Sequence, residues 1–231
     1  MIDIHAPHES VHTWTDFFIH IGTIAVGLLL AIGLEQSVEM IHHHHQSLAA
    51  QQSLHDQSIA NRALTQHDLS VIAECRRLIR KNMDVLDATQ PQSPLSETSF
   101  TPFLVWTYTP SPENNAWLGL RDTGGLELLP PQLAQAYGKV EFMRSIAVSS
   151  NELIITRRQE VQAILHLHNS PAKLTPDERE QLLIAFSKLD QALVEMRNAL
   201  VIFSGGNELA LAGIEISPAS EAPIFRQLPQ Q

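Results

Sequence analysis

The longest apolar stretch of the chain covers residues 17–34, where no Lys, Arg, Asp or Glu occurs. The one strongly polar side chain in this stretch belongs to His20, which lies one helical turn from its start. An α-helix of this length spans roughly 27 Å, close to the thickness of the hydrocarbon core of a bilayer. The stretch is apolar all round, whereas a core helix of a soluble protein has a polar face. We therefore predict a transmembrane helix over residues 17–41, preceded by a short tail over residues 1–16.

A secretory signal peptide is the main alternative for this segment. Signal peptides begin with a positively charged region, but residues 1–16 contain no Lys or Arg. The apolar run leads into Glu35 and Gln36 and not into a small-residue cleavage site. Gly27 and Ala31 are four residues apart, the spacing that lets membrane helices approach closely, so self-association is one open expectation.

The helix is expected to continue beyond the bilayer, because residues 35–88 contain neither Gly nor Pro. The second half carries an apolar face, formed by Leu64, Val71, Cys75, Leu78 and Val85 and widened by Ile72, Ile79, Met83 and Leu86. Pro91 and Pro94 end the pattern. A loop near residues 89–111 follows, and we expect its aromatic side chains to pack onto the helices.

Three further helices are predicted. A short one starts at Ser111-Pro112-Glu113 and ends at Gly124-Gly125. A long one starts at Pro131 and closes at Asn169-Ser170-Pro171; its buried side is Leu133, Tyr137, Val140, Met143, Ala147, Ile154, Val161 and Leu165.

The last helix has the strongest periodic signal in the chain. Thr175-Pro176-Asp177-Glu178 is a capping-box pattern, and Ser204-Gly205-Gly206 is expected to stop the helix. Between them, apolar residues recur at alternating four- and three-residue steps, as in a heptad seam: Leu182, Phe186, Leu189, Leu193, Met196, Leu200 and Phe203. The predicted fold is all-α: one amino-terminal transmembrane helix continues into an antiparallel helical bundle with coiled-coil-like packing. We expect the soluble domain to cover residues 42–216 and residues 217–231 to form a flexible tail.

Two short patterns carry a resemblance. Trp14-Thr-Asp16-Phe17 precedes an apolar helix that ends Gly33-Leu34-Glu35, and Ala116-Trp117-Leu-Gly-Leu120 is followed by Gly125-Leu-Glu-Leu128-Leu129. The chain thus resembles a group of uncharacterised bacterial single-pass membrane proteins with a helical carboxy-terminal region. The resemblance implies a bacterial inner membrane and no particular activity. Basic residues near the span are too few to set orientation firmly, and we favour a periplasmic soluble domain.

The chain of 231 residues has a formal net charge of -10, which argues against general nucleic-acid binding. Its densest basic cluster comprises Arg76, Arg77, Arg80 and Lys81, which we interpret as a solvated helix face. Cys75 is the single cysteine, and its position on the apolar helix face predicts a small buried residue and not a nucleophile.

Histidines supply the candidate chemistry. His8-Glu9-Ser10-Val11-His12 matches the His-Glu-x-x-His pattern of zinc hydrolases, in which two histidines bind the metal and the glutamate activates water. A catalytic zinc also needs a third ligand and a dry cleft, and a 16-residue tail offers neither by itself. We therefore predict no catalytic residue, and expect that neither His8 nor Glu9 takes part in catalysis.

A second cluster, His42 to His45, follows the span, and Glu39 precedes His42 with the Glu-x-x-His spacing of di-iron bundles. The candidate metal ligands, for zinc or iron, are His8, His12, His42 and His43. The alternative is a hydrated collar whose positive charge rises below pH about 6.5.

Three functional hypotheses result. The first is an anchored accessory, scaffold or sensor-like protein without catalytic activity, whose partners are the lipid bilayer and either another protein or a second copy of the chain. The second is metal or proton handling at the histidines. The third is zinc-dependent hydrolysis through His8, Glu9 and His12.

Overall fold

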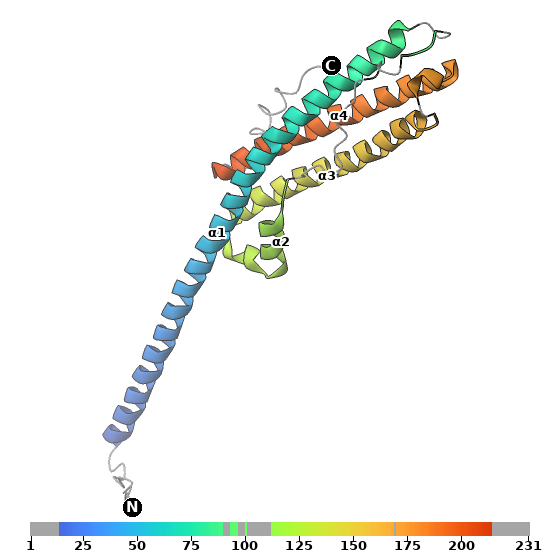
Figure 1. Cartoon of the computed structure of the whole chain (residues 1–231). Helices are drawn as coiled ribbons and strands as arrows, with labels where there is room; N and C mark the ends of the chain where they lie inside the picture. The colour runs from blue at the N-terminus through green and yellow to red at the C-terminus, as the bar shows by residue number, and fades with distance from the viewer. Residues whose placement is uncertain (1–13, 90–92, 97–99, 101–111, 169, 214–231) are drawn as a thin grey trace, which may run out of the picture. The chain divides into compact units, whose positions relative to one another are not determined.

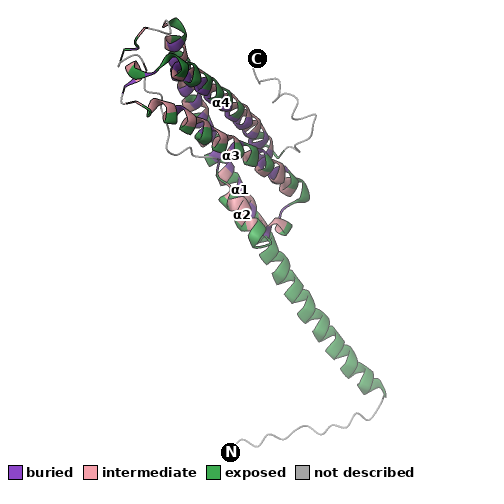
Figure 2. Cartoon of the chain, turned by 90° about the vertical axis from the view of Figure 1, so that its right-hand side faces the viewer, coloured by how far each residue is buried: buried purple, intermediate pink, exposed green. Residues whose placement is uncertain are grey.

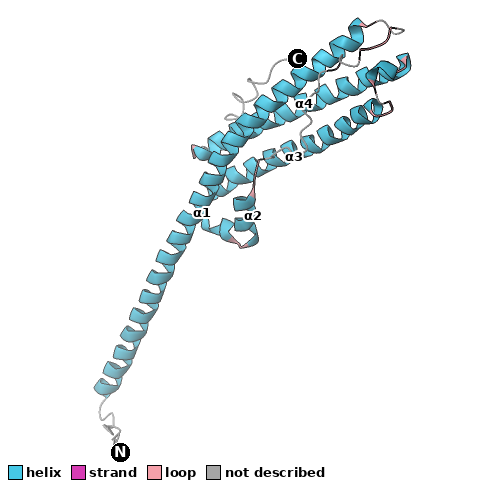
Figure 3. Ribbon diagram, viewed as in Figure 1, coloured by secondary structure: helices cyan, strands magenta, loops and turns pink. Residues whose placement is uncertain are grey.

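The computed structural model describes residues 14–89, 93–96, 100, 112–168 and 170–213. These residues form helices and connecting turns, with no strand among them (Figure 3). The chain divides into two compact units, Met1–Ala49 and Ala50–Gln231. The all-α prediction is confirmed for this part of the chain.

The first helix, α1, runs without a break over Trp14–Ala88. It therefore begins in the first unit and ends in the second, as the absence of Gly and Pro after residue 34 predicted. Residues 14–46 of this helix are exposed, whereas buried residues begin at Ala50 (Figure 2). Among the described helices, α1 is the one long and apolar enough to cross a membrane, and residues 17–34 are its candidate span.

The second unit contains a bundle of three long helices: the later part of α1, α3 (Pro131–Leu165) and α4 (Pro176–Leu211) (Figure 1). Arg76 of α1 binds Asp190 of α4, and Arg62 of α1 binds Glu208 of α4. The residue numbers therefore increase along α1 in the direction in which they decrease along α4. The two helices are antiparallel, and α3 is antiparallel to α4 as well. The expected antiparallel arrangement is thus present along α4.

The heptad seam of α4 forms the centre of the bundle. All seven of its apolar residues are buried, with Leu182, Phe186 and Leu200 fully enclosed. Thr175 starts the helix with the predicted capping box: its Oγ1 accepts from the backbone N of Glu178, and the Glu178 carboxylate accepts from the backbone N of Thr175. Burying each of these large side chains contributes roughly 1.5 to 3 kcal/mol, so the seam contributes strongly to the stability of the bundle.

Three predicted helix boundaries are wrong. The last helix does not stop at Gly205-Gly206 but continues to Leu211, because Gly206, Asn207 and Ala210 are buried against the bundle and this burial offsets the low helix propensity of glycine. The second long helix ends at Leu165 and not at residue 169, and His168 then bonds to Glu178 at the start of α4.

The third wrong boundary concerns the short helix α2 (Asn115–Asp122), which begins after Pro112 and not at it. It is followed by the 3₁₀ turn η1 (Gly125–Leu128); a second 3₁₀ turn, η2 (Pro171–Lys173), precedes α4. Of the loop aromatics, Phe100 packs on the bundle, with its ring centroid 6.4 Å from that of Phe186. Residues 101–111 lie outside the described part.

Candidate functional site

The histidine candidates fall into two groups. His8 and His12 lie outside the described residues, together with Glu9. His42 and His43 lie exposed on α1, where Nε2 of His43 is 3.6 Å from Oε1 of Glu39 and His42 bonds to Gln46 at 2.9 Å. The described ranges contain no group of three or more His, Cys, Asp or Glu placed to hold a metal ion. Metal binding at these four histidines therefore stays an alternative hypothesis.

Polar residues occupy the core face of α1 over about three helical turns. Between the buried Leu54 and Ile72, the inward positions are Ser58, Asn61, Thr65 and Asp68, each at most 4% exposed. We call these four residues the polar seam. The seam separates two apolar clusters of the bundle, one containing Leu54 and Tyr137 and the other containing Ile72 and Leu182.

The polar seam was not predicted from the sequence, because the core face of this helix was inferred from apolar residues alone. Leu64 and Val71 were expected on the core face, but both are half-buried and lie beside it. The missed signal was the spacing, because the four polar residues continue the alternating four- and three-residue steps of the apolar ones. Cys75, in contrast, is buried as predicted, and burial raises the pKa of its thiol to about 11.

Side chains of α1 hold the start of α2. Oε1 of Gln57 accepts from the backbone N of Ala116 at 2.5 Å, while its Nε2 donates to the carbonyl of Glu113 at 2.7 Å. Asn61, one turn later, bonds to the backbone N–H and C=O of Glu113. Gln57 thus binds one N–H group in the first turn of α2, which has no side-chain cap of its own, and Asn61 fixes Glu113, the residue before the N-cap. This explains why the helix begins at Asn115.

Asp68 is the titratable member of the polar seam. Its carboxylate is 4% exposed, and Oδ2 has no hydrogen-bond partner among the described residues; the same holds for Oγ1 of the neighbouring Thr65. Desolvation disfavours the charged form and raises the pKa of Asp68 to about 6, although the nearby His67 opposes the shift. A carboxyl group that changes charge near pH 6 therefore lies inside the bundle.

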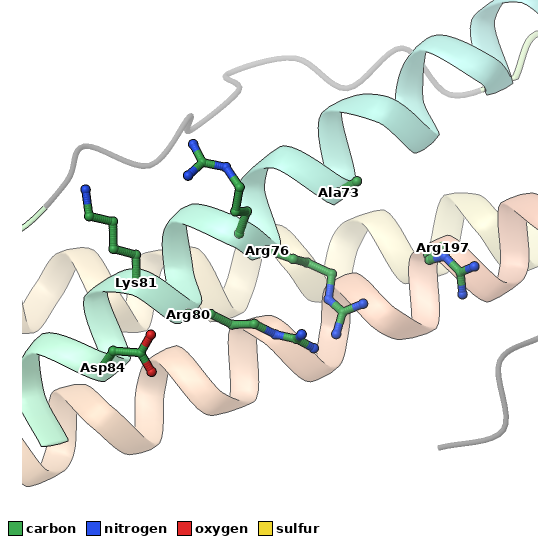
Figure 4. A pocket seen from close by; sticks show the side chains of 7 residues that line it. Ala73, Arg76, Arg80, Lys81, Asp84 and Arg197 are labelled. Atoms are coloured by element: carbon green, nitrogen blue, oxygen red, sulfur yellow. The ribbon is translucent and has the colours of Figure 1, made fainter.

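The basic cluster of α1 is more than a solvated face. Together with α4 it lines a hollow of about 540 Å³, the basic groove, whose lining is Ala73, Arg76, Arg77, Arg80, Lys81, Asp84 and Arg197 (Figure 4). Arg76 is about one-fifth exposed and makes two bonds to Asp190, at 2.8 and 3.2 Å. Arg80 reaches the same carboxylate at 3.5 Å. The prediction of a purely solvated face is therefore wrong for Arg76.

Comparison with other proteins does not assign the chain to a family. No protein-family model matches the chain, and neither a curated protein nor a solved structure matches it. Three features of the described residues bear on function: one continuous helix with an exposed apolar segment, a polar seam inside the bundle and a basic groove on its surface.

Proposed function

We propose that this chain is a membrane-anchored helical accessory protein, a scaffold or sensor that binds partner proteins and performs no chemistry itself. In this proposal residues 17–41 span a bacterial inner membrane, the tail before them is cytoplasmic and the bundle lies in the periplasm. The partner is another protein or a second copy of the chain.

One observation carries the proposal: α1 contains both the candidate membrane span and a core face of the bundle. Its apolar side chains between residues 17 and 34 are exposed, including Ile24, Leu29 and Leu30, each about 70% exposed. A soluble protein does not leave so long an apolar surface in water, whereas a lipid-facing helix requires it. An anchor that is covalently part of the bundle keeps the bundle at the membrane.

The polar seam supports a role beyond anchoring. Burying Oδ2 of Asp68 and Oγ1 of Thr65 without hydrogen-bond partners among the described residues reduces the stability of the bundle compared with apolar residues of similar size. Polar residues at heptad positions are best known for fixing which helices pair and in which register. We infer that the bundle is built for a defined conformation, which a scaffold or sensor needs in order to present one surface to its partner.

Partner capture from membranes tests the proposal. The full chain and a chain ending at residue 49 would be expressed at equal levels, cross-linked in intact cells and purified in mild detergent. We expect a specific protein, or a second copy of the chain, to be recovered in stoichiometric amount with the full chain and not with the anchor alone. A full chain that remains monomeric and unaccompanied would overturn the proposal.

Orientation is tested separately. A reporter enzyme that is active only after export, fused after residue 231, should be active if the bundle is periplasmic. A reporter that fluoresces only in the cytoplasm should be dark at the same position. The reverse pattern would place the bundle in the cytoplasm and contradict that part of the proposal.

A further inference from the structure

We propose that the basic groove binds a ligand bearing a phosphomonoester group. This goes beyond the scaffold role and does not depend on it. The groove draws its side chains from two helices: Arg76, Arg77, Arg80 and Lys81 from α1, and Arg197 from α4. Figure 4 shows the side chains of Arg76 and Arg80 directed into the space between the two helices.

The charge of the groove fits this ligand. Five cationic side chains line it, and three carboxylates offset them: Asp84 in the lining, Asp190 beside Arg76 and Arg80, and Glu74 beside Arg77. Five positive and three negative charges leave a formal surplus of two. A phosphomonoester carries about 1.5 to 2 negative charges at pH 7. The surplus is notable because the whole chain has a formal charge of -10.

The arginines are also held in place. Asp190 is mostly buried and binds both Arg76 and Arg80, so one carboxylate keeps two guanidinium groups side by side. A guanidinium has five N–H donors, and Asp190 leaves donors free on both arginines. Guanidinium groups match phosphate oxygens in pairs of parallel hydrogen bonds, and fixing them beforehand lowers the entropy cost of binding.

The size of the groove favours a compact ligand over an acidic protein. A hollow of about 540 Å³ lies within the range of small-molecule sites, roughly 300 to 1,000 Å³. An acidic protein would extend beyond the groove onto a chain that has 25 acidic and 15 basic residues. Like charges there would oppose docking, whereas a small phosphate ester avoids them.

Calorimetric titration of the full chain in a non-ionic detergent tests the proposal. The soluble arm uses glycerol 3-phosphate, with glycerol as the uncharged control. The lipid arm adds phosphatidic acid to the micelles, with phosphatidylcholine, a phosphodiester, as the control. Saturable binding in either arm, absent from its control, supports the proposal, and the responding arm shows whether the ligand is soluble or a lipid headgroup. The proposal is wrong if neither arm shows binding. It is also wrong if a polyglutamate peptide, titrated in the same way, binds and neither phosphomonoester does.

Variants locate the binding. Arg80→Gln should weaken binding about tenfold or more, because the phosphate group loses a charge-assisted hydrogen bond. The Arg80 side chain is exposed, so the fold should tolerate the substitution. Asp84→Asn should tighten binding several-fold, since it raises the positive surplus without adding a contact. Arg121→Gln is the matched control: it removes one exposed, ion-paired arginine from α2, far in sequence from the groove. Equal weakening in Arg121→Gln and Arg80→Gln would show a general charge effect and overturn the assignment.

Discussion

Asn61 and Glu113, 52 residues apart in the sequence, exchange two hydrogen bonds: the amide Nδ2 donates to the carbonyl of Glu113 at 2.8 Å, and the backbone N of Glu113 donates to Oδ1 at 2.7 Å. Asn61→Ala should therefore lower the free energy of unfolding by about 1 to 3 kcal/mol, because backbone groups of Glu113 lose their partners. Urea denaturation followed by circular dichroism measures the change. Gln52→Ala, at an exposed position of the same helix, is the control; an equal effect there would contradict the assignment.

The centre of the heptad seam is open to a direct test. Leu193 is 2% exposed, so Leu193→Ala should destabilise the bundle by about 2 to 5 kcal/mol through lost burial and the cavity left behind. Ile184 lies on the same helix but is 49% exposed, and Ile184→Ala should cost less than about 1 kcal/mol. Thermal unfolding of both variants distinguishes them, and similar midpoints would show that the seam is not the core.

Asp68 should make stability depend on pH. Its folded-state pKa is about 6, above the ordinary value of 3.8, so the folded state favours the neutral carboxyl. The carboxyl therefore costs no stability well below pH 3.8, and its penalty grows as the pH rises from there to about 6 and stays constant above. Asp68→Asn should be more stable than the wild type at pH 7.5, on the order of 1 to 2 kcal/mol after allowing for solvent screening.

The same variant should lose most of this advantage at pH 4, where the wild-type carboxyl is neutral in the folded state and only about half ionised in the unfolded state. Unfolding midpoints across pH 4 to 8 give the profile. Asp56→Asn, which changes an exposed carboxylate on the same helix, is the matched control and should follow the wild type. A stability difference between Asp68→Asn and wild type that is the same at every pH would show that the effect is not due to ionisation.

Removing the candidate membrane span should change localisation and not fold. A chain that begins at His42 lacks the candidate span but keeps the core face of α1 from Ala50 onward. We expect this chain in the soluble fraction, with the helix content per residue of the bundle retained by circular dichroism. An unfolded product would mean that residues 1–41 are required for folding, and a membrane-bound product would mean that the bundle itself binds lipid.

The metal hypothesis is tested without an affinity tag. His42 and His43 are exposed; His42 bonds to Gln46, and His43 lies beside Glu39. A stable zinc site needs about four ligands in tetrahedral geometry, so we expect His42→Gln/His43→Gln to leave the zinc content of the purified protein unchanged. The same result is expected for His8→Ala/His12→Ala. Stoichiometric zinc that either double variant removes would restore the metal hypothesis, and peptidase activity lost in Glu9→Gln would restore the hydrolase.

The long elements of the fold were predictable because their signals are local. The heptad residues of α4 and the capping box at Thr175 are buried and bonded as their spacing predicted. The start of α2 and the end of α4 were not predictable, because contacts distant in sequence decide them. The start of α2 depends on Gln57 and Asn61, and the extension of α4 past Gly206 depends on a bundle position where Asn207 donates to the carbonyl of Ser58.

The candidate sites divide in the same way. The basic cluster of α1 was visible in the sequence, but the hollow beside it also needs Arg197 and Asp190, which only the folding of α4 onto α1 brings near. The polar seam was not predicted, because apolar periodicity by itself assigns Ser, Asn, Thr and Asp to the surface of a helix. Their heptad spacing was the available clue.

The polar seam also limits how α1 can move. In a bundle with an apolar seam throughout, a helix could slide by one heptad, roughly 10 Å of rise, and find equivalent neighbours. Here such a step would carry Asn61 away from Glu113, either to the level of the apolar Leu54 or to that of Asp68. Each displaced polar group would then lose its bonds or enter an apolar layer. A piston-like displacement of α1 is therefore the costly mode of motion for this bundle.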